Sequence, residues 1–85
     1  MNMSEYNEMI TYINGLLKDK YRYISILCKR MSSKPSQDNL ELRKLYSSEC
    51  AEYIKLNELL IRYMREMIER SDDQIRQLNT ILSND

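Results

Sequence analysis

The side chains with the most chemical potential in this 85-residue sequence are two cysteines, Cys28 and Cys50. They form no Cys-x-x-Cys pair, and the sequence has no histidine that would activate a thiol or complete a zinc site. Both thiols stand at the spacing of an apolar stripe, so we expect free, buried thiols that act as small hydrophobic side chains, which fits a reducing compartment. We therefore expect no catalytic residue, no metal site and no cofactor.

A cluster of carboxylates is the second chemical feature, since paired carboxylates can serve as general acid and base. Its members are Glu66, Glu69, Asp72 and Asp73. Arginines at positions 62, 65 and 70 alternate with them, and charges at this spacing pair along the surface of a helix. The sequence also contains no nucleotide-binding loop, calcium loop or nucleophile elbow. These features indicate a protein that is not an enzyme.

Cations near the start of the sequence form a candidate basic patch. Its members are Lys18, Lys20, Arg22, Lys29 and Arg30. Residues 1–34 hold six cations against three anions, although the whole sequence holds 13 of each. Cations interleaved with tyrosines are typical of single-strand binders, but nucleic-acid-binding domains usually have a clear basic excess. The alternative is a solvated helix face that complements the helix dipole, so we do not expect nucleic acid as a partner.

Helices must position these residues, because one glycine and one proline leave almost no turn signals for a sheet. The proline stands among small polar residues and predicts a turn over residues 33–38. Asn2 with Glu5, and Asp38 with Glu41, have the spacing of capping boxes. We predict one all-α domain: a helix over about residues 3–32, the turn, and a helix over about 39–83. The second helix is expected to be continuous, or to bend near residues 70–72.

The first predicted helix has one apolar row with a single charged interruption, Lys20. The row consists of Tyr6, Ile10, Ile13, Leu17, Ile24, Leu27 and Met31. We expect the Lys20 ammonium group to reach water along its apolar stem. Gly15, beside this row, either allows another helix to approach closely or is simply tolerated.

The second predicted helix carries the most regular pattern, a heptad repeat. Its main row is Ile54, Ile61, Ile68, Ile75 and Leu82, and the row three residues on is Cys50, Asn57, Met64, Ser71 and Leu78. We expect these rows to face the first helix in an antiparallel hairpin. The polar residues Asn57 and Ser71 either fix the register or lie at a wet edge.

Apolar residues outside this arrangement predict a partner. A second apolar face of the long helix consists of Leu42, Leu45, Leu56, Leu59 and Tyr63. Ile75, Leu78 and Leu82 lie where the shorter first helix cannot reach. We predict that both sets bind a helical protein or further copies of the chain, completing a helical bundle or coiled coil. No apolar run exceeds three residues, so we expect no membrane span, no signal peptide and a cytoplasmic protein.

Three stretches resemble small helical-hairpin proteins of type III secretion, both the needle subunits and their small chaperones. Residues 34–38 (Lys-Pro-Ser-Gln-Asp) look like a needle hairpin turn, residues 46–53 like the tyrosine-to-tyrosine run that follows it, and residues 60–67 like a later amphipathic stretch. The resemblance covers less than half of the sequence. Residues 69–85 extend beyond the end of needle subunits, which favours the chaperone over the needle.

The expected function is therefore non-enzymatic: an assembly or secretion chaperone or adaptor that buries an amphipathic helix of its partner. The first alternative is a needle-like structural subunit that polymerises with itself. The second, less favoured, is a small nucleic-acid-binding regulator that uses the basic patch.

Overall fold

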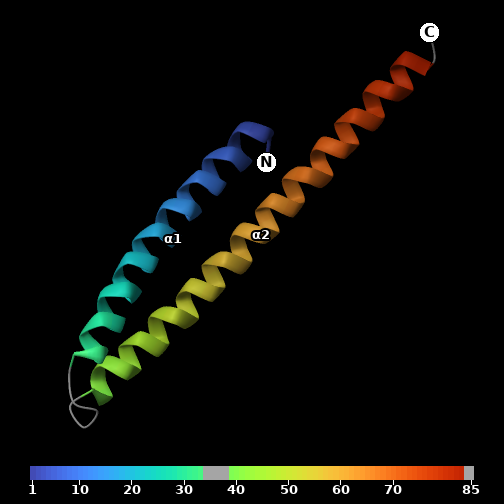
Figure 1. Ribbon diagram of the computed structural model, residues 1–85. Helices are drawn as coiled ribbons and strands as arrows, with labels where there is room; N and C mark the ends of the chain where they lie inside the picture. Colours follow the sequence, from blue (N-terminus) through green and yellow to red (C-terminus); the bar gives the residue numbers. More distant parts are fainter. Residues whose placement is uncertain (34–38, 84–85) are drawn as a thin grey trace.

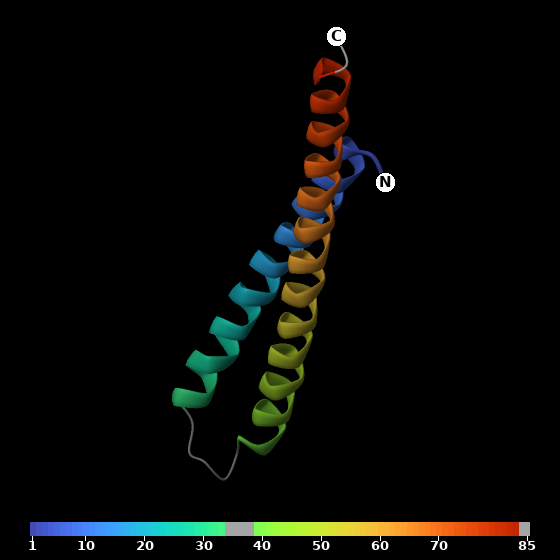
Figure 2. The same cartoon turned by 90° about the vertical axis from the view of Figure 1, so that its right-hand side faces the viewer.

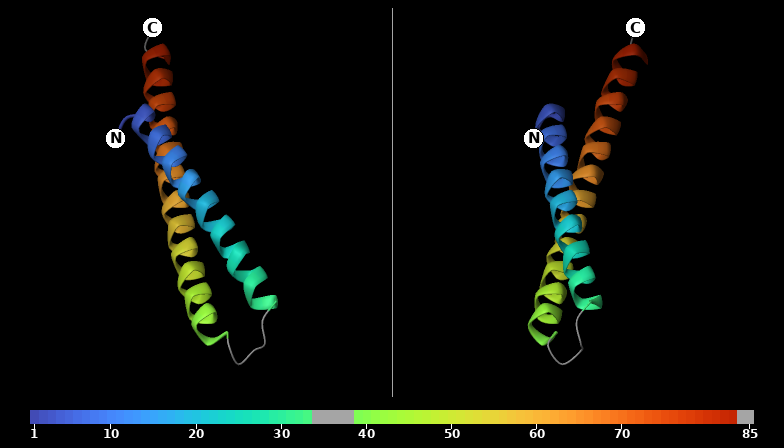
Figure 3. Two further views of the ribbon diagram at one scale, coloured as in Figure 1. Left: turned by 90° about the vertical axis from the view of Figure 1, so that its left-hand side faces the viewer. Right: turned by 60° about the vertical axis from the view of Figure 1, so that its left-hand side comes forward.

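The computed structural model describes residues 1–33 and 39–83, which form two antiparallel helices (Figure 1). Helix α1 spans Met3–Ser32 and helix α2 spans Leu40–Ser83. The prediction of an all-α helical hairpin with a long second helix is confirmed. The hairpin measures 74 × 16 × 15 Å, and its helices cross at a shallow angle (Figures 2 and 3). Within the described residues, neither helix is apolar over a length that would cross a membrane.

Helix α1 begins with the predicted capping box. The side-chain oxygen of Asn2 accepts a hydrogen bond from the backbone N–H of Glu5 at 2.8 Å. The Glu5 carboxylate in turn accepts one from the backbone N–H of Asn2 at 3.3 Å. The two bonds satisfy N–H groups that have no partner inside the helix. Lys29 and Arg30 in the last turn complement the negative end of the helix dipole.

Asn39 joins the two helices where the chain turns back, and it is 3% exposed. Its side-chain Nδ2 donates a hydrogen bond to the carbonyl oxygen of Met31 at 3.0 Å, in the last turn of α1. Its own carbonyl oxygen accepts from the backbone N–H of Arg43 at 2.8 Å, in the first turn of α2. Sequence patterns placed the cap of α2 at Asp38, which lies outside the described residues.

The core is a single seam between the helices. On α1, Tyr6, Ile13, Leu17 and Leu27 are buried, as the predicted apolar row requires. Eight half-buried residues of α2 recur every three or four positions and form the row that faces α1: Leu42, Tyr46, Glu49, Tyr53, Leu56, Leu60, Tyr63 and Met67. Cys50, Leu59, Glu66 and Ser71 are also half-buried and flank this row. No described residue of α2 is fully buried.

The heptad row that we expected to face α1 lies instead on the surface. Ile54, Ile61, Ile68 and Ile75 are each about half exposed. The prediction that α1 covers this row is therefore wrong. A 3.5-residue period identifies an apolar face of a helix, but it does not identify the neighbour that covers that face.

Helix α2 continues without a break through residues 70–72 and projects past the start of α1 (Figure 1). The last side-chain interaction between the helices joins the Ser71 hydroxyl to the sulfur of Met3 at 3.8 Å. Every residue from Asp72 to Ser83 is exposed. This overhang is about 18 Å long at 1.5 Å per residue.

Gly15 lies in the middle of α1, where glycine costs helix stability. A Cβ atom placed there meets no heavy atom within 4 Å, so α2 does not need glycine at this position. We expect Gly15→Ala to raise the free energy of unfolding by about 0.5–1 kcal/mol, because alanine loses less backbone entropy. Thermal unfolding followed by circular dichroism at fixed protein concentration measures the change. Ala51→Gly, at an exposed position of α2, should lower stability by a similar amount. A loss of stability in Gly15→Ala would contradict the prediction.

Asn39 supplies a test of the link between the helix ends. Asn39→Asp keeps the backbone carbonyl that accepts from Arg43 but loses the Nδ2 donor to the Met31 carbonyl, so we expect a loss of about 1–2 kcal/mol in urea unfolding. Asn2→Asp is the matched control, because the Asn2 side chain only accepts and the two residues cap helices equally well. Equal effects of the two substitutions would show that the bond to Met31 contributes nothing.

Candidate protein-binding surface

Lys20 is the charged residue within the buried row of α1, and two carboxylates of α2 neutralise it. Its Nζ atom lies 2.5 Å from Oε2 of Glu49 and also donates to the carboxylate of Glu52. The side chains of Lys20 and Glu49 are only 25% and 14% exposed. The expected route to water is therefore replaced by an ion-paired site at the edge of the seam. A charge that leaves water requires such partners.

The ion pairs shift the pKa of one residue on each helix, Lys20 on α1 and Glu52 on α2. Hydrogen bonds to Glu49 and Glu52 raise the pKa of Lys20 above its ordinary value. The hydrogen bond from Lys20, helped by its positive charge, lowers the pKa of Glu52. Each partner favours the charged form of the other, so the site is formed near neutral pH.

A second contact shows that the ion pairs belong to one register. The rings of Tyr6 and Tyr63 meet edge to face, with centroids 6.5 Å apart. Two heptads separate Tyr6 from Lys20 on α1, and two heptads separate Glu49 from Tyr63 on α2. A slip by one residue would turn Glu49 away from Lys20 and leave the ammonium group without a partner. The charge therefore decides which face of α2 lies against α1.

Because this face of α2 lies against α1, another apolar face of α2 stays uncovered. We call this uncovered face the α2 stripe. It consists of Ile54, Ile61, Met64, Ile68, Ile75, Leu78 and Leu82, and these side chains are between 42% and 62% exposed. At 100° per residue, it lies about a quarter turn from the row that faces α1. It therefore runs beside the hairpin seam and continues along the overhang.

The predicted partner-binding residues divide between the two faces. Leu42, Leu56, Leu59 and Tyr63 are half-buried, and Leu56 and Tyr63 lie against α1. Leu45 is exposed at 37%. Ile75, Leu78 and Leu82 of the overhang are exposed, as expected from the unequal helix lengths.

Sequence reasoning did not assign the middle of the α2 stripe, from Ile54 to Ile68, to a partner. The signal that would have done so is Lys20. A lysine within an apolar row needs an acidic neighbour, and Glu49 lies in the row of α2 that also contains Tyr53 and Leu56. Pairing the two charged residues identifies the covered face and leaves the isoleucine row free.

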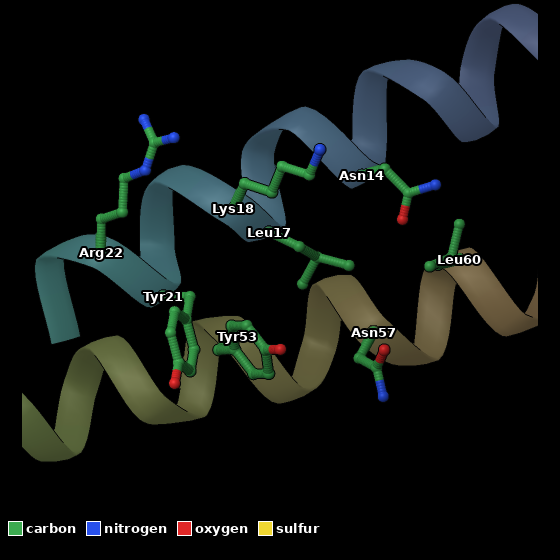
Figure 4. A pocket seen from close by; sticks show the side chains of 8 residues that line it. All are labelled: Asn14, Leu17, Lys18, Tyr21, Arg22, Tyr53, Asn57 and Leu60. Carbon is green, nitrogen blue, oxygen red and sulfur yellow. The ribbon is translucent and has the colours of Figure 1, made fainter. Parts of the chain in front are cut away.

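The predicted basic patch is dispersed over the hairpin. Lys20 turns into the seam, while Lys29 and Arg30 lie in the last turn of α1. Lys18 and Arg22 line a groove of about 380 Å³ whose opposite rim is Asn57 of α2. Its other lining residues are Asn14, Leu17, Tyr21, Tyr53 and Leu60. Leu17 and Tyr21 extend from α1 toward α2, whereas Lys18 and Arg22 point away from α2 (Figure 4).

Both cysteines are free thiols. Cys50 is half-buried, but Cys28 is exposed, so the expected burial of Cys28 is wrong. A side-chain hydrogen bond with Cys50, and the charges of Cys50 and Cys28, raise the pKa of Tyr46. Across residues 1–33 and 39–83, no group of three or more potential metal ligands is brought together.

Comparison with known proteins gives no relative: no family model, no curated protein and no solved structure matches the sequence. The properties of the surface therefore have to be inferred from its own geometry.

The ion-paired site predicts the pH dependence of stability. Glu52 has a lowered folded pKa, so its contribution is complete above its unfolded pKa and is lost as the pH falls through the folded value. Lys20 has a raised folded pKa, so its contribution is complete below its unfolded pKa and is lost as the pH rises through the folded value. We expect the urea midpoint to fall between about pH 5 and pH 3, and again in strong alkali.

Two lysine variants test the origin of this dependence. Lys20→Met should lower the urea midpoint at neutral pH and flatten the acid decline, because Glu52 then titrates without its cation. Lys18→Met removes an exposed lysine of the same helix and should keep the wild-type pH profile. The same acid decline in both variants would assign it to other carboxylates.

Proposed function

We propose that this protein is a non-enzymatic helix-binding module, an assembly chaperone or adaptor that buries an amphipathic helix of a protein partner. The observation that carries the proposal is the exposure of the α2 stripe. The stripe has the heptad spacing by which one helix packs along another. Its occupant is therefore expected to be a helix that lies along α2.

The size of the stripe supports this function. Seven half-exposed aliphatic side chains, at roughly 100 Å² each, present roughly 700 Å² of apolar surface. A standard protein interface buries about 800 Å² per partner, whereas the largest apolar patch of a typical monomer is about 300–600 Å². The stripe thus resembles one side of an interface more than ordinary surface.

The overhang suggests how a partner would be held. From Asp72 to Ser83, α2 is exposed on all sides, so a bound helix reaches its apolar residues without displacing α1. Nearer the turn, α1 packs against one side of α2 and holds it in place, while the α2 stripe stays exposed on the neighbouring side. The resemblance to small type III secretion chaperones agrees with this mode of binding, since those proteins hold helical subunits before assembly.

A stripe variant tests the proposal. The tagged double variant Ile68→Glu, Ile75→Glu should lose any helical protein that the wild-type chain captures from its native host, because two charges would enter the interface. Ile26→Glu is the matched control, since Ile26 is similarly exposed on α1 and lies outside the stripe.

Quantitative mass spectrometry of the captured proteins measures the ratio between variant and control. We expect the partner to decrease at least tenfold with the stripe variant and to remain with the control. A partner retained equally by both variants would bind elsewhere on the hairpin and would remove the basis of the proposal.

A further inference from the structure

We infer that a second copy of this chain covers the α2 stripe in the free protein, its α2 antiparallel and Arg65 of each copy beside Asp72 of the other. This inference rests on the proposed function, because it names an occupant of the same surface. It makes the free protein a two-fold dimer in which identical patches face each other.

The charges along one edge of the stripe specify the orientation. Glu58, Arg65 and Asp72 follow one another every seven residues on the edge away from α1, and their signs alternate. The other edge contains Tyr53 and Leu60, which line the groove beside α1. In an antiparallel pair, like edges meet, so the charged edge of one copy meets the charged edge of the other. A parallel pair would set these charges against the apolar edge, where they have no counterpart.

The apolar residues then select one register. Ile61 opposite Leu78 of the other copy, and Met64 opposite Ile75, give four apolar layers across the two-fold axis. Arg65 then lies within two residues of Asp72 of the other copy, about 3 Å along the axis. This register uses the overhang of both chains.

The competing register pairs Glu58 with Arg65 of the other copy. In this register the overhang of one copy lies closer to the turn of the other. Ile75, Leu78 and Leu82 of one copy then lie opposite Cys50, Ser47 and Arg43 of the other. A cation and a hydroxyl would then replace apolar layers. The first register instead sets Ile75 and Leu78 opposite Met64 and Ile61. The roughly 700 Å² that each copy exposes is close to what a standard interface buries per partner, about 800 Å².

The same register brings opposite charges together at the ends of the dimer. The last turn of α2 has no basic side chain, so the negative end of its dipole is not neutralised within that turn. Leu82 of one copy lies opposite Asn57 of the other, and Asn57 forms one rim of the groove lined by Lys18 and Arg22 (Figure 4). Two exposed cations thus lie beyond the end of the incoming helix.

Ser71 limits the strength of this dimer. It lies near the two-fold axis opposite Ile68, where a polar residue in an apolar row fixes register at a cost in stability. A dimer of moderate affinity can exchange its second copy for a helix of another protein. The dimer and the proposed partner therefore compete for one surface.

Light scattering coupled to size exclusion, over a range of protein concentrations, measures the dimer. Ile75→Glu lies in the overhang and leaves the hairpin seam intact, and it should weaken dimerisation more than about 100-fold by placing two charges in apolar layers. Ile26→Glu should dimerise as the wild type does. A wild-type monomer at all concentrations, or an Ile75→Glu dimer of unchanged affinity, would overturn the inference.

Charge exchange tests the pairing of Arg65 with Asp72. Arg65→Glu and Asp72→Arg should each weaken dimerisation about tenfold. Each substitution alone places two pairs of like charges at the edges of the dimer interface. The double variant should restore the wild-type affinity. The two positions are seven residues apart in one chain and cannot form an ion pair there, so rescue requires the second copy. Failure of the double variant to recover would exclude this register.

Cross-linking tests the orientation in a Cys28→Ser, Cys50→Ser background. Asn57→Cys and Leu82→Cys, each alone, should remain unlinked on mild oxidation, whereas their mixture should give one linked species with both masses. Linkage of either variant to itself would indicate a parallel pair and overturn the inference. A monomer that still captures a helical partner through the stripe would refute the dimer and retain the proposed function. A confirmed dimer that captures no helical partner would retain the dimer and refute the proposed function.

Discussion

The placement of Lys20 against Glu49 and Glu52 is the constraint on which the rest of the structure depends. Lys20 lies inside the apolar row of α1, and two carboxylates of α2 face its ammonium group at the edge of the seam. Only one face of α2 offers such a carboxylate at the matching height. The ion pairs therefore select that face and fix the register, which the contact between Tyr6 and Tyr63 also obeys.

The selection has a consequence for stability and binding. The face of α2 that contains Glu49 also carries tyrosines and half-buried leucines and lies against α1. The α2 stripe, whose isoleucines are more regularly spaced, stays exposed. Among residues 1–33 and 39–83, only four apolar residues are buried, which is a small core. Chains of this size usually need further contacts for stability. Any helix that covers the α2 stripe stabilises the folded chain by mass action. Binding at this surface, as proposed, would for that reason be linked to folding.

One surface then serves two proposed roles. A second copy would protect the α2 stripe from water when no partner is present, and a partner helix would replace that copy. The polar residues within the heptad rows, Asn57 and Ser71, keep such an interface from becoming permanent. The alternating charges at its edge restrict which helices fit, because a wrong sequence would set like charges against Arg65 or Asp72.

The sequence by itself determined the two helices, their approximate ends and the buried row of α1. Proline, capping residues and apolar period act over neighbouring positions, so local physics sets them. It also determined that α2 is too long and too apolar for one neighbour. It did not reveal the role of Asn39, because that residue links helix ends eight positions apart through a hydrogen bond to Met31. Only the tertiary structure decided which apolar face of α2 is covered. Periodicity makes the two faces equivalent candidates, and their difference arises when Lys20 meets an acid 29 residues away.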